Sequence, residues 1–476
     1  MANRLPFEIL QQIFALSCPI SYSITTPIVL PFHLTISHVC LTWRQAILGY
    51  PALWSNIDIN ANAQDFHTLS RTHALFQFAL AASAPAMLSL SLRITSLWEY
   101  DIGAEAVLET AAWVSRRWRH VEIHIISRLF TGGEYDGVGH ILCSVRDNIP
   151  HLESLALYTP CIPGAENIFH NAPSLRHVNG FHAYNILFKL PWSQLRTLAF
   201  TLSSGVGVTD ILPYLSNLRF CTCLEVLVIK DGFSSVPPNM RGFPIVLPRV
   251  HTVESSNTQP FPILNLPSLR RLSSAFESPP NFTNPIAEMI TRSNAILSTL
   301  ICPHTTCANQ QLANCCPSLL HLVSHTPRLY LYPRSLPMAD VETLLEWLND
   351  SSRFPQLESL NIAHHIELRD DLCADGVFAW VDAIMQARAD TLRRVNIVVA
   401  IDMPRSSVQL AHVIKLYLSP SHEIRERLER GPCMVDISFT IPGTDMRHHV
   451  VQSSKREENN LPEELRDWEE DCPCLR

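Results

Sequence analysis

The chain has 476 residues, a net charge of −8, 47% hydrophobic residues and only 17% charged ones. This length exceeds what one compact core needs, so we expect several domains or an extended array, and the composition excludes general disorder. No run of lysines and arginines suggests nucleic-acid binding, and no apolar segment of about 18 residues suggests a membrane span. The first residues lack the pattern of a signal peptide, so the fourteen cysteines are expected to be free, buried thiols.

Two helices are expected at the start of the chain. Apolar residues fall at helical spacing over residues 5–14, and Pro6 suits a first helical turn. A polar loop marked by prolines is predicted from residue 17 to about residue 31. A second helix follows, with the large side chains of residues 36–47 on one side, and a short strand is expected over residues 55–59.

This start resembles the F-box, a helical domain that docks on an adaptor protein. The resemblance rests on three phrases in their order and spacing: Leu5-Pro6-x-x-Ile9-Leu10-x-x-Ile13-Phe14, then Val39-Cys40-x-x-Trp43-Arg44, then Pro51-x-Leu53-Trp54. The whole chain is similar to a large fungal set of F-box proteins with divergent leucine-rich repeats. In that set a strand rich in Ser and Leu (here residues 85–94) and an Arg-Trp-Arg-His phrase (residues 117–120) commonly follow.

The resemblance also implies which residues would contact the adaptor. They are Leu5, Pro6, Ile9, Leu10, Ile13, Phe14, Val39, Cys40 and Trp43. An F-box would explain why both helices carry more large apolar side chains than one internal face can cover. The alternative is a pair of capping helices that shields the first repeat of an array.

Further helices are expected over residues 61–83, 104–118 and 139–149, and around residues 377–385. The last three each come directly before a strand. Towards the end, a charged helix is expected between Ser421 and Gly431, followed by a last edge strand over residues 434–440.

A phrase of the form Pro-x-Leu-x-x-Leu recurs along the chain. Leucines two apart point to one face of a strand, and proline ends the segment before it. Most copies are 19 to 29 residues apart, as in a leucine-rich repeat, so the sequence predicts a solenoid of parallel strands and helices. The alternative is an ordinary α/β domain with leucine-rich strands. The first leucine or valine of each copy is residue 152, 175, 195, 224, 250, 269, 297, 319, 357 or 392, and residues 118–125 look like an earlier, degenerate copy.

The third, fifth and seventh positions of each copy are expected to face away from the core. In a leucine-rich horseshoe this face is concave, and stacked repeats often bind a partner there. Aromatic and basic side chains on it are candidate target-binding residues, because aromatic and arginine side chains dominate binding hot spots. They are Tyr158, Phe181, Lys230, Arg271 and Arg394.

Candidate catalytic chemistry is sparse. Cys302, His304, Cys307, Cys315 and Cys316 lie close together in the sequence, but they form no paired Cys-x-x-Cys knuckles, so we expect no bound metal. The chain has no phosphate-binding glycine loop, no dinucleotide fingerprint and no nucleophile elbow. We therefore expect no cofactor and no enzymatic activity.

These observations predict an α/β protein with four regions: an F-box-like helical domain (1–60), a linking helix and first strand (61–116), a leucine-rich-repeat-like solenoid (117–452) and an acidic polar tail (453–476). The resemblance implies the substrate-recognition subunit of an SCF (cullin-type) ubiquitin ligase. The F-box would dock on a Skp-family adaptor, and through it a cullin, while the repeats hold a target protein in the cytoplasm or nucleus. One alternative is a repeat scaffold that does not engage the ubiquitin machinery. Another is a metal-dependent activity at the cysteine cluster.

Overall fold

The protein forms two compact units, residues 1–232 and 233–476, and each contains parallel strands and helices. A computed structural model describes residues 5–19, 21–25, 31–62, 66–96, 102–127, 136–158, 166–182, 189–201, 216–230, 244–256, 260–275, 284–307, 309–325, 344, 347–367, 374–402, 426, 433–440 and 447–452. This α/β arrangement is compatible with a solenoid. None of the described helices combines the length and apolarity needed to cross a lipid bilayer.

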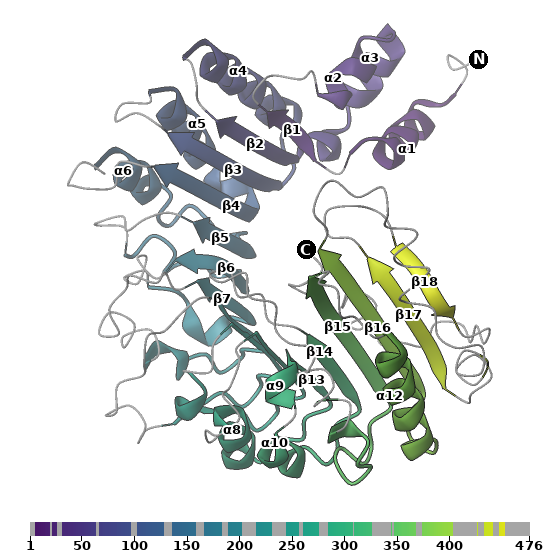
Figure 1. Cartoon of the computed structure of the whole chain (residues 1–476). Helices are drawn as coiled ribbons and strands as arrows, with labels where there is room; N and C mark the ends of the chain where they lie inside the picture. The colour runs from purple at the N-terminus through teal and green to yellow at the C-terminus, as the bar shows by residue number, and fades with distance from the viewer. Residues whose placement is uncertain are drawn as a thin grey trace. The chain divides into compact units, whose positions relative to one another are not determined.

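The first unit contains eight strands that follow one another in chain order, all parallel (Figure 1). Helices α4, α5 and α6 lie along one side of this sheet. The elements are α1 (Phe7–Ser17), β1 (Tyr22–Thr25), α2 (Phe32–Ser37), α3 (Leu41–Leu48), η2 (Pro51–Trp54), β2 (Asn56–Asn62), α4 (Phe66–Ala82), β3 (Leu88–Ser96), α5 (Ile102–Trp113), η3 (Ser115–Arg117), β4 (Trp118–Ser127), α6 (Asp136–Ser144), β5 (Ser154–Tyr158), β6 (His177–His182), η5 (Trp192–Gln194), β7 (Thr197–Thr201) and β8 (Val226–Lys230).

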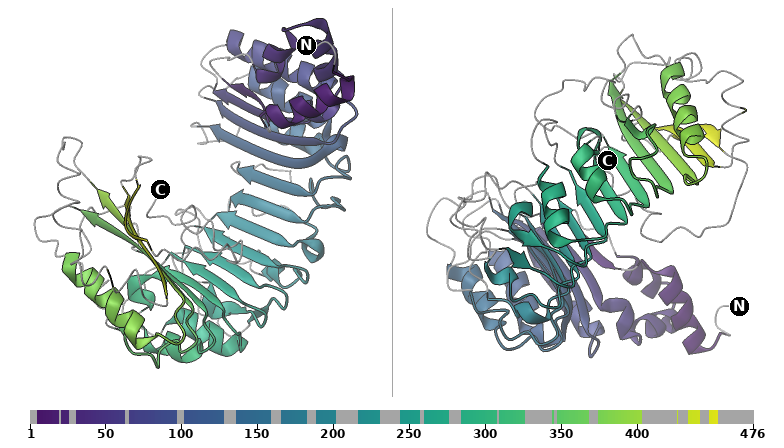
Figure 2. Two further views of the ribbon diagram at one scale, coloured as in Figure 1. Left: turned by 90° about the vertical axis from the view of Figure 1, so that its right-hand side faces the viewer. Right: turned by 90° about the horizontal axis from the view of Figure 1, so that it is seen from below.

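The second unit repeats the plan, and Figure 2 shows its strands following one another like those of the first. Its main sheet runs β10, β12, β13, β14, β15, β16, β17, β18, parallel except for the last pair, and β9 and β11 form a small separate sheet. The elements are β9 (Ile245–Val246), β10 (Thr252–Ser255), η7 (Phe261–Ile263), β11 (Leu264–Asn265), β12 (Arg271–Ser274), α8 (Pro285–Ser293), β13 (Thr299–Pro303), α9 (His304–Cys307), α10 (Gln310–Cys315), β14 (His321–His325), β15 (Ser359–Glu367), α12 (Ala374–Ala387), β16 (Arg394–Asp402), β17 (Met434–Thr440) and β18 (Arg447–Gln452).

The recurring leucine phrase forms the strands as predicted. In all ten copies the strand begins two residues after the first leucine or valine, and that first residue is buried. The residue directly before each strand helps to fix the register of the strands. Its N–H donates to the carbonyl of the equivalent residue one copy earlier. Examples are Arg176 to Glu153 (2.9 Å), Arg196 to Arg176 (2.8 Å) and Arg393 to Glu358 (2.9 Å). Within each unit, successive copies are thus hydrogen-bonded to one another just outside the strands.

Arginine side chains join neighbouring segments on the helical side. Arg117, from the Arg-Trp-Arg-His phrase, donates to the carbonyls of Leu80, Ser83 and Ala86, where α4 ends and the chain turns towards β3. Carbonyls at and just after a helix end lack the regular helical partner, and a guanidinium with several donors can bind all three together.

Arg388, directly after α12, repeats this device in the second unit. It is 2% exposed, and its guanidinium donates to four backbone carbonyls. Arg292 at the end of α8 does the same to two carbonyls around η7. Burial lowers the pKa of all three arginines. The carbonyls bound by Arg388 belong to Leu348, Asp350, Arg353 and Phe354.

The prediction of a loop from residue 17 to about residue 31 was wrong in part, because this segment contains β1. Tyr22 and Ile24 of β1 are buried, and the strand pairs in parallel with β2. The Tyr22 ring packs against His33 and Trp54, with ring centroids 5.5 and 5.1 Å away, so β1 forms over an aromatic cluster. The boundary expected at residue 60 also falls inside β2. The N-terminal helices and the sheet are therefore joined without a break.

Two other expectations need correction. The second helix is two helices, because α2 ends at Ser37 and α3 begins at Leu41, with a turn between them. The strand over residues 434–440 is present but is not at the edge, since β18 pairs with it in antiparallel orientation. The helix expected after Ser421 and the tail after residue 452 lie almost entirely outside the described residues.

Candidate functional site

Helix α1 carries two apolar stripes. Leu10 and Phe14, four residues apart, are 2% and 3% exposed and face the interior. Ile9, Ile13 and Leu16 follow a second helical stripe and are 40%, 41% and 89% exposed. The first stripe packs within the protein, and the second is presented to solvent.

Helix α3 packs against α1 on the side of its buried stripe. The Phe14 ring contacts the edge of the Trp43 ring, with centroids 5.2 Å apart. The Gln11 side chain donates to the carbonyls of Ala46 (3.4 Å) and Gly49 (3.2 Å), which fixes α1 against the end of α3. The position of the outer stripe is therefore set by internal contacts.

The N-terminal segment exposes nine large apolar side chains, each between 37% and 89% exposed; seven belong to α1, α2 and α3, and Leu5 and Val39 lie next to these helices. Exposed large apolar side chains in this number are typical of a protein interaction surface, since soluble monomers rarely expose large apolar patches. We call this set the N-terminal apolar surface. Its members are Leu5, Phe7, Ile9, Ile13, Leu16, Phe32, Val39, Leu41 and Leu48.

The structure divides the nine expected adaptor contacts. Leu10 and Phe14 are buried, so their inclusion among the contacts is corrected: they hold α1 in place. Cys40 and Trp43 are half-buried. The other five are exposed: Leu5, Pro6, Ile9, Ile13 and Val39.

A second candidate surface is the face of the first unit's sheet that points away from its buried leucines and isoleucines. The register aligns side chains of β1 to β4 across this face: Ser23, Asp58, Ser91 and Glu122 are neighbours in succession. We call these four residues the acceptor row. The sequence predictions missed it, because β1 was expected to be a loop and the outward positions were taken only from the copies after residue 150.

Next to this row, the Tyr158 ring lies between His124 and Gly180. It is stacked on the ring of His124, with centroids 3.9 Å apart and an interplanar angle of 19°. His124 Nε2 lies 2.5 Å from Glu122 Oε1. On the far side, Gly180 has a φ of 63° at an irregularity in the β6–β7 register, and the Tyr158 ring fills the space of its absent side chain. Burial, and then the charge of Glu122, raise the pKa of Tyr158.

The five predicted target-binding residues fall in different surroundings. Lys230 is exposed, whereas Tyr158, Arg271 and Arg394 are half-buried. Phe181 belongs to β6, but its side chain lies outside the described ones. Lys230 is in the first unit, and Arg271 and Arg394 are in the second, on different strands. The five residues therefore belong to five different strands.

In the second unit the expected open face is buried along β14, β15 and β16. Val323, Ala363 and Val398 are at most 2% exposed and form a hydrophobic cluster with Ile301 at its margin. Asn361 and Asn396, expected to face solvent, are 3% and 2% exposed. The prediction of an exposed binding face was wrong for this part of the sheet.

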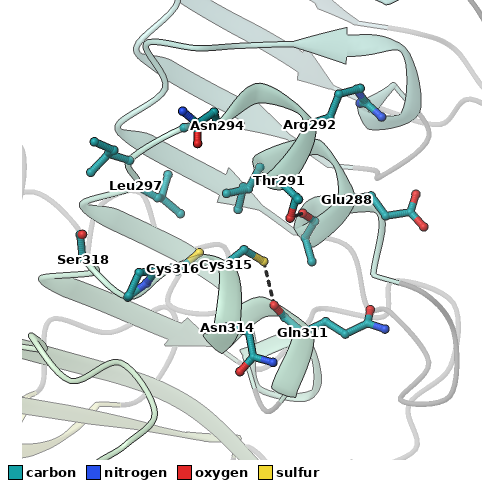
Figure 3. A pocket seen from close by; sticks show the side chains of 15 residues that line it. Glu288, Thr291, Arg292, Asn294, Leu297, Gln311, Asn314, Cys315, Cys316 and Ser318 are labelled. Atoms are coloured by element: carbon teal, nitrogen blue, oxygen red, sulfur yellow. Dashed lines mark hydrogen bonds between the residues drawn. The ribbon is translucent and has the colours of Figure 1, made fainter.

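The second unit also has a groove of about 1030 Å³ between α8 and α10 (Figure 3). Thr291, Asn294, Gln311 and Cys315 are among its lining residues. The thiol of Cys315 donates to the Gln311 carbonyl, with Sγ and O 2.7 Å apart. Its pKa is lowered to about 7, mainly because the Cys316 thiol donates a hydrogen bond to it and also because of Thr291. Cys315 is thus suited to react as a thiolate near neutral pH.

The other cysteines of this cluster are buried. The Sγ atoms of Cys302 and Cys307 are 2.9 Å apart, and burial raises the pKa of Cys302. The side chain of His304 lies outside the described ones. Among the side chains that the structure places, no three of the His, Cys, Asp or Glu type converge as a metal site requires. The expected absence of a metal remains a prediction.

Comparison with known proteins gave no match: no model of a protein family and no curated protein matches the sequence.

Proposed function

We propose that this chain is the substrate-recognition subunit of an SCF ubiquitin ligase. The N-terminal apolar surface would dock on a Skp-family adaptor that binds a cullin. The sheet units, as a leucine-rich-repeat-like solenoid, would hold a protein target in the cytoplasm or nucleus. The chain itself would make no covalent bond. It would act by raising the local concentration of a target lysine near the ubiquitin-conjugating enzyme.

The exposure of nine large apolar side chains on and next to three short helices carries this proposal. Leaving a valine, leucine, isoleucine or phenylalanine in water forgoes about 1.5–3 kcal/mol of burial energy per side chain, so a partner that covers several of them binds strongly. Four of them, Leu5, Ile9, Ile13 and Val39, belong to the F-box phrases, which is why a Skp-family adaptor is the proposed occupant.

The test is a pull-down of the full chain with purified Skp-family adaptor. Ile9→Asp combined with Ile13→Asp is expected to abolish capture, because a carboxylate buried in a dry interface costs several kcal/mol. Ile296→Asp is the matched control, since Ile296 is 72% exposed in the second unit. Deletion of residues 1–60 is a poor test, because it would remove β1 and most of β2.

Equal capture of the double variant and the control would contradict the proposal. In that case the alternative function, a repeat scaffold that does not engage the ubiquitin machinery, would be favoured.

A further inference from the structure

The acceptor row is rich in hydrogen-bond acceptors and contains no basic side chain. Asp58 is flanked by Ser23 on β1 and Ser91 on β3, and Ser91 by Glu122 on β4. The row continues with Ala156 on β5, which is small and uncharged. Two carboxylates and two hydroxyls thus lie along one line of the sheet, about 4.8 Å apart from strand to strand.

Part of this row has unmet hydrogen-bonding capacity. Asp58 Oδ1 and Ser91 Oγ are buried atoms without a hydrogen-bond partner among the residues that the structure describes. The other oxygen of Asp58 accepts only a long bond from Ser23 Oγ, at 3.5 Å. No described ion pair includes Asp58. Buried polar atoms are nearly always paired in folded proteins, so this pair of neighbours points to a ligand that supplies donors.

The side of the row towards β5 is rigid. Glu122 is held through Oε1 by His124, which is stacked on Tyr158, and the Tyr158 ring in turn fills the space beside Gly180. A positive φ and a register irregularity inside a strand are features that proteins keep mainly where they orient a side chain. The carboxylate of Glu122 therefore has a fixed position next to Ser91.

We propose that the acceptor row binds an arginine side chain of a partner protein, with the guanidinium over Ser91 between Asp58 and Glu122. A guanidinium has five N–H donors in one plane, which can serve several acceptors in a line, whereas a lysine ammonium is a compact point charge with three. Hydrogen bonds between charged groups are the strongest of these contacts. The identification of that partner as a ubiquitination target rests on the proposed function; binding of arginine does not.

The test starts from a heptapeptide display library selected on the purified full-length chain. Enrichment of arginine at one position is expected. A selected peptide, labelled with fluorescein, is then titrated by fluorescence anisotropy, together with versions in which that arginine is replaced by lysine or citrulline. Citrulline keeps the shape but loses the charge, and it is expected to weaken binding about tenfold or more. Lysine is expected to weaken it less.

Asp58→Asn combined with Glu122→Gln is expected to cause a similar loss of about tenfold or more for the arginine peptide, with little change for the citrulline peptide. The matched control is Glu105→Gln with Glu109→Gln, which removes two exposed carboxylates from α5. Selected peptides without arginine, or equal binding to both double variants, would overturn the proposal. The assay contains no adaptor, so failure of adaptor docking leaves its outcome unaffected, and the reverse also holds.

Discussion

The ring of Tyr158 occupies the place that a side chain at residue 180 would need. A Cβ built on Gly180 would lie 1.8 Å from Tyr158 Cζ, well inside van der Waals contact, and the φ of 63° at Gly180 disfavours any residue with a Cβ. The two residues therefore depend on each other: the glycine allows the ring to lie there, and the ring supports His124 and, through it, Glu122.

Gly180→Ala is expected to destabilise the first unit by about 3 kcal/mol, because a left-handed alanine costs about 1–2 kcal/mol and the clash adds to it. In a Tyr158→Ala background the same change is expected to cost only the backbone part. Calorimetric melting of the four proteins in this double-mutant cycle measures the difference. Equal costs in both backgrounds would show that the ring does not press on residue 180.

Leu10→Asp is expected to lower the stability of the protein, and Ile13→Asp is expected to lower its affinity for the adaptor. The two residues nevertheless belong to one helix and to the same F-box phrase. Leu10 is buried, so an aspartate there should lower the stability of the protein by about 3 kcal/mol or more. Ile13 is 41% exposed, so an aspartate should leave the melting temperature nearly unchanged and lower the affinity for the adaptor a few hundred-fold. Thermal melting and titration with the adaptor distinguish the two. A large stability loss in Ile13→Asp would mean that its side chain is internal.

Cys315 is expected to be alkylated by iodoacetamide at a rate that rises with pH through about pH 7, since the thiolate is the reactive form and the pKa is lowered to about 7. Cys18 is the comparison, because it too is half-buried but burial raises its pKa, so its rate should rise only at higher pH. Cys316→Ala removes the main hydrogen bond to Cys315 and should shift the rise towards pH 9. Mass-spectrometric labelling of individual cysteines follows each rate, and identical pH profiles for Cys315 and Cys18 would contradict the assignment.

Arg388→Met is expected to destabilise the second unit by about 3 kcal/mol or more, because four backbone carbonyls lose their shared donor. The control is Arg353→Met: that arginine is partly exposed and forms an ion pair with Asp350 at 3.2 Å, which is worth less than about 1 kcal/mol. Thermal unfolding of both variants gives the comparison. If Arg388→Met loses no more stability than Arg353→Met, water replaces the hydrogen bonds of the guanidinium, which would contradict the prediction.

The strands could be predicted from the sequence because each one has a local signal. A buried leucine or valine, two intervening residues and a second buried leucine or valine recur in every copy, and pairing with the neighbouring strands then completes the sheet. Helix α12, expected around residues 377–385, was predictable for the same reason.

The missed elements depend on contacts that are distant in sequence. Strand β1 has four residues, and its burial comes from His33 and Trp54, so nothing in the short segment itself distinguishes it from a loop. The turn between α2 and α3 contains neither proline nor glycine, and the apolar periodicity runs through it unbroken. The acceptor row requires β1 to β4 to be in register, which no single stretch of sequence reveals.

The hydrogen bonds just outside the strands also affect which insertions and deletions the chain can accept during evolution. Two successive copies are 20 residues apart where residues 175 and 195 begin them and 38 apart where residues 319 and 357 do, yet both pairs meet in the same register. Doubling the length of a connecting segment adds only about 0.6 kcal/mol of closure entropy. Insertions between copies can therefore accumulate without disturbing the sheet, which leaves these segments free to diverge in length and composition while the strands stay aligned.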